Sequence, residues 1–201
     1  MAYLFALAVG YWLGCSHMAL NISKWKHIDI RKAGSSNLGA ANSTIVLGWR
    51  CGILVGLHDI GKAVVAVLLT KYLFPDSLYA GVTAGVACVI GHIFPLPLKF
   101  RGGKGFASFI GLTVALNWKL ALIVAVLIVV ITVITDYLVA GTLTTIVVVP
   151  TYMGITTQNL LLTSVILIAT AVIFYKHWEN IPRMLNGTEI GLRRTLKKKD
   201  R

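Results

Sequence analysis

The residues with the clearest chemical potential are the cations and glycines of segment 99–106, which reads Lys-Phe-Arg-Gly-Gly-Lys-Gly-Phe. Glycine lets a backbone turn with positive φ and approach a ligand closely, and successive N–H groups in such a turn form a nest that binds anions. Arg101 and Lys104 add full positive charge beside Gly102, Gly103 and Gly105. The combination predicts a phosphate-binding loop, with a plain basic loop containing turn glycines as the alternative. Because Gly105 follows Lys104, the segment is not a nucleotide-hydrolysing Walker A loop.

A second cluster of small polar residues occupies segment 34–42, just before an apolar run. Gly34, Ser35, Asn37, Gly39 and Asn42 supply hydroxyl, carboxamide and backbone N–H groups near an expected helix start. Such groups at a helix N-terminus suit an anionic oxygen. A flexible turn whose Asn and Ser cap the helix is an equal alternative.

The third cluster begins where the last apolar segment ends, and includes His177, Glu179, Asn180 and Arg183, followed by Asn-Gly-Thr-Glu at 186–189. His177 and Asn180 are three residues apart, so on a helix they share a face. A histidine can move a proton near neutral pH, and an asparagine can donate to a developing oxyanion. The alternative is an interfacial belt that anchors the helix end.

Two ionisable residues, Asp59 and Lys62, lie three apart within an apolar segment. A pair of this kind usually neutralises itself against the interior of a helical bundle. We expect Asp59, Lys62 and His92 to be structural, or to orient a nearby site, and we expect the same of Glu179 and Arg183 in the third cluster. His17 is expected to be packed or interfacial.

The composition identifies a membrane protein: of 201 residues 57% are hydrophobic and 13% are charged, and the mean hydropathy is +0.80. A soluble domain carries about twice that charged fraction. Long uncharged runs favour a helical bundle over an alternating β-barrel. The net charge of +12 sits in loops and the tail, which fits membrane topology and anionic lipid better than nucleic-acid binding. Three cysteines lie inside apolar segments, and no set of side chains has metal-ligand spacing, so we expect no cofactor and no metal.

We therefore predict an all-α integral membrane protein with about seven transmembrane helices. The expected spans are residues 2–22, 45–70, 78–98, 105–118, 120–135, 138–155 and 160–175. Residues 1–190 are expected to form one membrane domain, and residues 191–201 a basic cytosolic tail.

The orientation follows from the distribution of cations. With seven spans, fifteen cations fall on one side: Lys24, Lys26, Arg31, Lys32, Lys99, Arg101, Lys104, Lys176, Arg183, Arg193, Arg194, Lys197, Lys198, Lys199 and Arg201. The opposite loops keep only Lys71 and Lys119. The positive-inside rule then places the N-terminus outside and the C-terminus and all three polar clusters in the cytosol.

Taken together and in order, the motifs resemble those of the bacterial acyl-phosphate:glycerol-3-phosphate acyltransferases, the PlsY family. They are Gly34-Ser-x-Asn-x-Gly-Ala-x-Asn42, Asp59-x-x-Lys62, Gly91-His-x-Phe-Pro95, the segment 99–106 and His177-x-Glu-Asn-Ile-x-Arg183. The resemblance covers nearly the whole chain. It implies a seven-helix inner-membrane enzyme that moves a fatty acyl group from acyl phosphate to the sn-1 hydroxyl of glycerol 3-phosphate. The products would be 1-acylglycerol 3-phosphate (lysophosphatidate) and phosphate, and no cofactor is implied.

On that resemblance the predicted site residues receive roles. Lys104 with the backbone of its loop, and Ser35 with Asn37, would hold the two substrate phosphates, since both substrates are anions. His177 would deprotonate or orient the glycerol hydroxyl, and Asn180 would polarise the acyl carbonyl or bind phosphate. The acyl chain would lie between spans. The oligomeric state and the acyl-chain preference are left open.

The sequence also departs from the family pattern at five positions, which are Ser36, Ala41, Ile45, Ala63 and Trp178. The pattern has arginine where Ile45 and Trp178 stand, and each charged hydrogen bond not replaced weakens a phosphate subsite by ~1.5–3 kcal/mol. The alternative reading is a weakly active or redirected homologue. A small-anion transporter is disfavoured, because most polar motifs lie at one interface and, of the Asp, Glu, Lys and Arg residues, only Asp59, Lys62 and Arg50 fall within spans.

Overall fold

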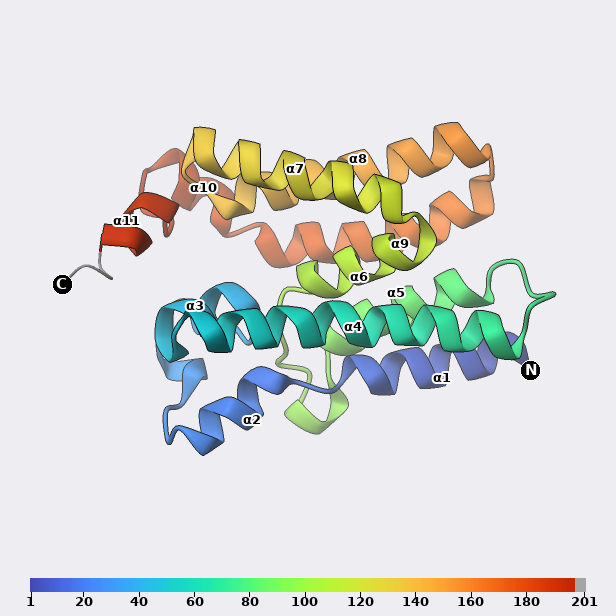
Figure 1. Ribbon diagram of the computed structural model, residues 1–201, viewed down its shortest axis with the longest axis horizontal. Coiled ribbons are helices and arrows are strands. Elements are labelled where there is room, and N and C mark those ends of the chain that lie inside the picture. The colour runs from blue at the N-terminus through green and yellow to red at the C-terminus, as the bar shows by residue number, and fades with distance from the viewer. Residues whose placement is uncertain (198–201) are drawn as a thin grey trace. The chain divides into compact units, whose positions relative to one another are not determined.

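The computed structural model describes residues 1–197, and this part of the chain contains helices and turns but no strand (Figure 1). The predicted all-α membrane fold is confirmed. The chain divides into two compact units, Met1–Leu116 and Asn117–Arg201, which are described separately. Of the predicted basic tail, Lys198, Lys199 and Arg201 lie outside the described residues.

The first unit contains four helices that pack on one another and several short elements that join them. The elements are α1 (Ala2–Gly14), α2 (Met18–Trp25), η1 (Ile30–Lys32), α3 (Ala40–Leu47), α4 (Trp49–Leu73), α5 (Ala80–Ile93), η2 (Leu96–Leu98) and α6 (Phe106–Leu116). Helix α1 packs along α5, and α4 packs against α1, α5 and α6. The short elements α2, η1 and α3 lie together at one end of α4 (Figure 1).

Within residues 1–197, six segments are long and apolar enough to cross a membrane: Ala2–Trp25, Trp49–Leu73, Ala80–Leu98, Trp118–Thr135, Leu138–Thr157 and Leu160–His177. The remaining predicted span, residues 105–118, is represented by α6, a shorter apolar helix of 11 residues. At 1.5 Å per residue such a helix covers about half of a ~30 Å hydrocarbon core. The count of seven crossings, and the orientation deduced from it, stay predictions.

Two predicted spans differ from the helices of the structure, one by an interruption and one by its start. The expected continuous helix over residues 2–22 is interrupted after Gly14, and His17 is extended (φ −132°, ψ 99°) where α2 begins. The expected start of the second span at residue 45 falls inside α3, because Gly48 adopts φ 97° and separates α3 from α4. At the first interruption, the backbone carbonyls of Gly14 and Ser16 accept hydrogen bonds from the side chain of Lys62.

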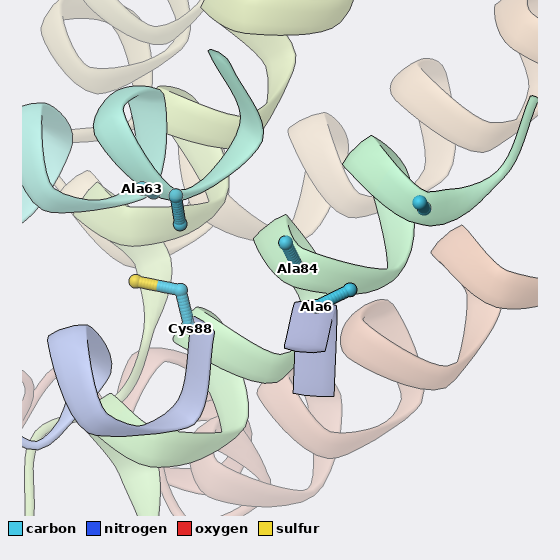
Figure 2. Close-up of a cluster of buried hydrophobic side chains, with 6 residues drawn as sticks. Ala6, Ala63, Ala84 and Cys88 are labelled. Atoms are coloured by element: carbon cyan, nitrogen blue, oxygen red, sulfur yellow. The ribbon is translucent and has the colours of Figure 1, made fainter. Parts of the chain in front are cut away.

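The core of the first unit is built from small side chains, so the helices approach closely. Ala6 of α1, Ala63 of α4, and Ala84 and Cys88 of α5 are fully buried and lie close together (Figure 2). A Cβ added to Gly10 would stand 2.1 Å from the carbonyl oxygen of Ala84. Small residues at helix interfaces are the usual route to tight packing in membranes, where the hydrophobic effect does not drive helices together.

The close contact between α1 and α5 makes a prediction about stability. A Cβ on Gly91 would lie 2.2 Å from the carbonyl oxygen of Tyr11, which is backbone and cannot rotate away. We expect Gly91→Ala to push the helices apart at a cost of about 1–3 kcal/mol, lowering Tm in detergent by several degrees. Gly61→Ala in α4 is the matched control, because its Cβ would meet nothing within 4 Å. The control should be neutral or stabilising by about 0.5–1 kcal/mol, and equal Tm values for the two variants would contradict this packing.

The described part of the second unit contains three long helices and two short ones: α7 (Trp118–Thr135), α8 (Leu138–Thr157), α9 (Leu160–His177), α10 (Asn180–Leu185) and α11 (Leu192–Lys197). Helix α8 packs against both α7 and α9. Side chains of Asn117 and Asn159 accept the N–H of Leu120 and Leu162, so they cap the starts of α7 and α9.

The turn between α7 and α8 also holds the start of the tail. Asp136 is left-handed (φ 72°) and ends α7, as expected for a loop residue. Its carboxylate accepts the backbone N–H of Arg193 at 2.7 Å, and its carbonyl accepts the N–H of Leu192 at 2.8 Å. Arg193 Nη2 also donates to the carbonyl of Val133 at 3.2 Å. The described beginning of the tail is therefore bound to its own unit and not simply a solvated run.

Candidate functional site

The first polar loop is organised around the side chain of Asn42, which is fully buried. Its Oδ1 accepts the backbone N–H of Ser35 at 2.8 Å. Its Nδ2 donates to three backbone carbonyls, those of Ile30, Ala33 and Asn37, at 3.2, 3.1 and 2.9 Å. These bonds hold the loop in place, so we assign Asn42 a scaffold role within the loop in place of the substrate contact expected from the sequence.

The same loop exposes the groups that remain available for a ligand. Gly34 (φ 60°) and Ser36 (φ 57°) are left-handed, and they turn the chain so that Ser35 is exposed. Gly39 is the N-cap of α3, and Asn37 is half-buried beside it. Upstream, the side chain and backbone N–H of Arg31 donate to the half-buried carboxylate of Asp29, which lowers the pKa of that carboxyl. Ser35, Asn37 and the start of α3 thus form a polar rim at the entrance to the helix.

The glycine-lysine loop differs from the nest predicted from its sequence. The N–H groups of Gly102 and Gly103 donate to the carbonyls of Ile93 and His92, at 3.2 and 3.1 Å. In this structure these two amides are used to attach the loop to the end of α5, so they are not offered to an anion, and that part of the prediction is corrected. Glycine is required instead by close approach, because a Cβ on Gly102 would lie 2.0 Å from the carbonyl oxygen of His92.

The three cations of this loop differ in how far they are exposed to solvent. Lys99 (φ 53°) and Gly105 (φ 85°) turn the chain on either side of the loop. Lys104 is half-buried, whereas Arg101 and Lys99 are exposed. Lys104 is therefore the loop cation held most closely by the protein.

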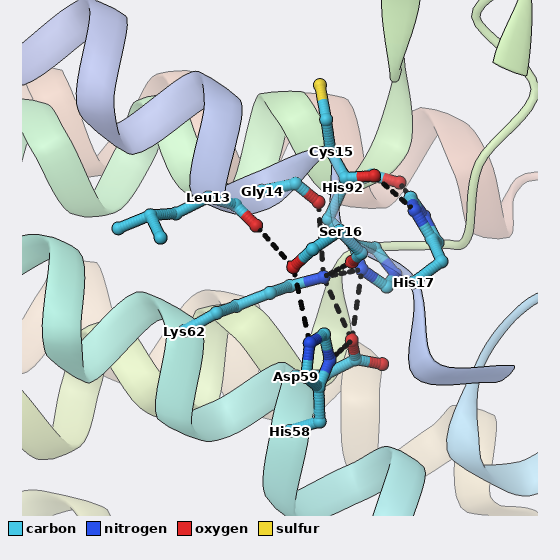
Figure 3. Close-up of polar contacts among 9 residues, drawn as sticks. All are labelled: Leu13, Gly14, Cys15, Ser16, His17, His58, Asp59, Lys62 and His92. Atoms are coloured by element: carbon cyan, nitrogen blue, oxygen red, sulfur yellow. Dashed lines mark hydrogen bonds and ion pairs between the residues drawn. The ribbon is translucent and has the colours of Figure 1, made fainter. Parts of the chain in front are cut away.

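Beneath the loop lies a buried polar network (Figure 3). Asp59 and Lys62 form the predicted ion pair, with 2.9 Å between Nζ and Oδ1, and both side chains are almost fully buried. His58 Nδ1 donates to the same carboxylate oxygen at 3.3 Å, and His92 Nδ1 lies 3.5 Å from it. His17 stacks on His92 with ring centroids 4.9 Å apart, as expected for a packed histidine. Among residues 1–197 no group of His, Cys, Asp and Glu side chains could hold a metal ion.

In the second unit, His177 and Asn180 flank the junction between α9 and α10, and both are buried. His177 Nδ1 lies 2.8 Å from the carbonyl oxygen of Ile173. Since a carbonyl only accepts, Nδ1 carries the proton and Nε2 of the neutral ring is the basic nitrogen. Glu179 and Arg183 form an exposed ion pair at 3.1 Å on α10, which is worth little energetically.

Asn180 has a partner to which the sequence analysis assigned no role. Its Nδ2 donates to Glu189 Oε2 at 2.9 Å. Gly187 (φ 67°) turns the chain after α10, and the N–H groups of Thr188 and Glu189 both bond to the carbonyl of Arg183. This turn brings Glu189 back to the start of α10. The Asn-Gly-Thr-Glu motif after α10 was the available signal, because its glycine predicts such a turn.

Ser16 and His58 also belong to the buried network, although neither was expected there from the sequence. Ser16 Oγ lies 3.2 Å from His58 Nε2. His58 is next to Asp59 in the sequence and could have been noticed for that reason. Ser16 had no signal, because its contacts depend on the interruption between α1 and α2.

The fold and these polar loops define an all-helical integral membrane protein with polar and basic groups gathered at helix ends. Sequence comparison gives the particular family: the profile of the glycerol-3-phosphate acyltransferases matches residues 4–187. The chain is 37% identical to glycerol-3-phosphate acyltransferase 1 of Oceanobacillus iheyensis, over 96% of each chain. It is 35% identical to the Coxiella burnetii enzyme, over 94% of this chain and 97% of that one. The chain belongs to the glycerol-3-phosphate acyltransferase family and is a membrane acyltransferase.

Solved structures agree with this assignment. A crystal structure of PlsY, an integral membrane glycerol 3-phosphate acyltransferase, in its glycerol 3-phosphate form has a TM-score of 0.90 at 29% identity, covering 96% of both chains. The lysophosphatidic acid form of PlsY has a TM-score of 0.88 at the same 29% identity, covering 98% of this chain and 99% of that one. The family resemblance inferred from the sequence motifs is confirmed.

Proposed function

We propose that this protein transfers a fatty acyl group from acyl phosphate to the sn-1 hydroxyl of glycerol 3-phosphate, giving lysophosphatidate and inorganic phosphate. One observation carries the proposal. The two PlsY structures similar to this chain were solved in a glycerol 3-phosphate form and a lysophosphatidic acid form. These two molecules differ by one acyl group, so they are the acceptor and the product of a single acyl transfer.

The residues of the first unit supply the anion-binding part of the proposed site. Lys104 is the half-buried cation of its loop, and Ser35 and Asn37 stand at the rim of the other loop. Both substrates carry phosphate, and a charged hydrogen bond to phosphate contributes about 1.5–3 kcal/mol. Arg101, Gly102, Gly103, Gly105, Gly34 and Gly39 shape these two loops. We assign Lys104 and Ser35 direct contact with substrate.

The residues of the second unit supply the proton acceptor and a hydrogen-bond donor. His177 Nε2 would take the proton as the glycerol oxygen attacks the acyl carbon, and the bond from that carbon to the phosphate oxygen would break. Asn180 would donate to the acyl carbonyl oxygen or to phosphate. Acyl phosphate is a mixed anhydride with a good leaving group, so positioning and charge stabilisation suffice. No cofactor is required by this chemistry.

The proposed site would face the cytosol of a bacterial inner membrane. The fifteen cations of the polar loops and the tail support that orientation under the positive-inside rule, provided that α6 completes a seventh crossing. Anionic lipid headgroups would then lie beside the same loops. Residues 1–190 would act as one membrane domain although they comprise parts of two compact units.

The test is an assay of the purified protein in detergent with glycerol 3-phosphate and palmitoyl phosphate, without added metal. Release of phosphate matched by formation of lysophosphatidate supports the proposal. Palmitoyl coenzyme A in place of palmitoyl phosphate tests the donor, and turnover with that thioester alone would contradict the acyl-phosphate assignment.

Absence of turnover with either donor, in a folded and monodisperse sample, would favour the weakly active homologue. Ile45 motivates that alternative, because it lies on α3 close to the first polar loop and is 37% exposed where the family pattern has arginine. Ile45→Arg would then be the variant to assay next.

A further inference from the structure

Between α1 and α2 the helix is interrupted, and backbone carbonyls at the end of α1 lose their helical hydrogen-bond partners. Lys62 reaches this gap from α4, and its Nζ donates to the carbonyls of Gly14 at 3.2 Å and Ser16 at 2.8 Å (Figure 3). Unpaired carbonyls at a helix end need such a donor when they are buried. One side chain of α4 therefore fixes the end of α1.

The same ammonium group also contacts His92 of α5. The distance from Lys62 Nζ to His92 Nδ1 is 2.8 Å, and His92 is 2% exposed. Because an ammonium group has only donors, Nδ1 is the acceptor, and the proton of the neutral ring is on Nε2. His17 closes the other side, with its ring stacked on His92 and its Nε2 3.1 Å from the His92 carbonyl oxygen. Lys62 and His17 together leave the imidazole of His92 one orientation.

In that orientation the His92 ring packs against Gly103 of the glycine-lysine loop. A Cβ on Gly103 would lie 2.2 Å from His92 Nε2, so the ring edge occupies the space of a missing side chain. The N–H of Gly103 bonds to the carbonyl of the same histidine at 3.1 Å. His92 thus contacts Gly103 through both its ring and its backbone, and Gly103 directly precedes Lys104.

We propose that Lys62 and His92 are positioning residues for phosphate binding: Lys62, held by the α1–α2 gap, fixes the ring of His92, and the ring fixes Gly103 and hence Lys104. This inference rests on the proposed function of Lys104. It extends the structural role expected for Asp59, Lys62 and His92 by naming the group that they place. Asp59 neutralises Lys62, and its Oδ2 has no hydrogen-bond partner among the described residues.

The buried network of Asp59, Lys62 and His92 is not explained by a contribution to folding stability alone. A buried ion pair pays a desolvation cost that can exceed its attraction, and apolar residues of similar size often do as well. Here the four contacts of Lys62 Nζ join α1, the segment between α1 and α2, α4 and α5 at one point. A fixed geometry is what such an arrangement provides.

The first experiment measures how inorganic phosphate inhibits turnover, because phosphate is a product and a probe of the Lys104 subsite. We expect Lys62→Met to raise its inhibition constant at least tenfold. Lys62→Met/Asp59→Asn removes both buried charges together, so it avoids an unpaired carboxylate and should show the same rise. Thr70→Val is the matched control: Thr70 is fully buried in α4 and bonds only to its own helix, at the carbonyl of Ala66. A folded double variant with the inhibition constant of the control would overturn the inference.

A double-mutant cycle separates positioning from a general structural role. In the background of Lys104→Arg, Lys62→Met should raise the inhibition constant by less than threefold, because the group that it places has already changed. Full additivity would mean that Lys62 acts elsewhere and would overturn the proposal. If Lys104→Ala left turnover unchanged, the proposed function of that loop would fail. If Lys104→Ala were inactive while the network variants behaved normally, only this inference would fail.

A second pair of variants does not depend on the folding of the Lys62 variants. Gly103→Ala places a methyl group on the His92 ring and should weaken phosphate inhibition at least tenfold. In a His92→Ala background the same methyl group has room, so Gly103→Ala should cost at least threefold less there than in the unmodified protein. An equal cost in both backgrounds would show that the ring does not position Gly103 and would overturn the proposal.

Discussion

Replacing Lys104 by alanine is expected to reduce kcat/KM by about 10²–10³-fold, the usual cost of removing one donor aimed at developing charge. Lys104 is the half-buried cation of a loop whose glycines are attached to α5 by two backbone hydrogen bonds. A cation held in this way needs little reorganisation when phosphate binds. The measurement is the initial rate of phosphate release with palmitoyl phosphate and glycerol 3-phosphate.

The matched control for this variant is Lys99→Ala. Lys99 belongs to the same basic segment but is exposed, so its removal changes the net charge equally and should reduce the rate less than threefold. A similar loss in both variants would mean that the loop contributes only diffuse positive charge. An unchanged rate for Lys104→Ala would contradict the proposed role of this loop.

Replacing Asn180 by alanine is also expected to change the kinetic constants strongly. Asn180 is buried at the start of α10, and Glu189 Oε2 accepts from its Nδ2 at 2.9 Å. If Asn180 donates to the acyl carbonyl oxygen, the variant should lower kcat by about 10²–10³-fold with little change in KM. If it binds phosphate, KM should rise instead. The ratio of the two changes therefore decides between the two roles.

Asn186→Ala is the control for Asn180→Ala, because Asn186 is an exposed asparagine at the other end of the same short helix. Its kinetic constants should stay within twofold of the unmodified protein. Glu189→Gln should reproduce part of the Asn180 effect, since it replaces a charged acceptor by a neutral one without changing size. A wild-type rate in Asn180→Ala would exclude Asn180 from the chemistry.

The protein class and the main motifs could be predicted from the sequence because they depend on residues that are close together in the chain. Apolar runs as long as the bilayer core require helices, whatever the rest of the chain does. Asp59 and Lys62 are three apart on one helix, so their ion pair follows from the helical repeat alone. His177 and Asn180 occupy the junction of two helices because the last apolar run ends there. Such features depend on neighbours in the chain.

The amides of Gly102 and Gly103 show where that reasoning failed. A run of glycines beside lysine predicts a nest that faces an anion, but the two N–H groups bond to the carbonyls at the end of α5. Asn42 is a similar case, because its type suggested a ligand contact and its four hydrogen bonds are all to the loop around it. Only the folded chain determines which acceptors a donor meets.

Apolar runs and ordered motifs were enough to predict a helical membrane enzyme of the acyltransferase family with three polar clusters outside its spans. The interruption within residues 2–22, and the Lys62 side chain that fills it, appear only in the folded chain. The same is true of the placement of His92 against Gly103. Buried carbonyls, charges and ring nitrogens must all be satisfied in three dimensions. Their partners come from helices far apart in the chain, which no local pattern specifies.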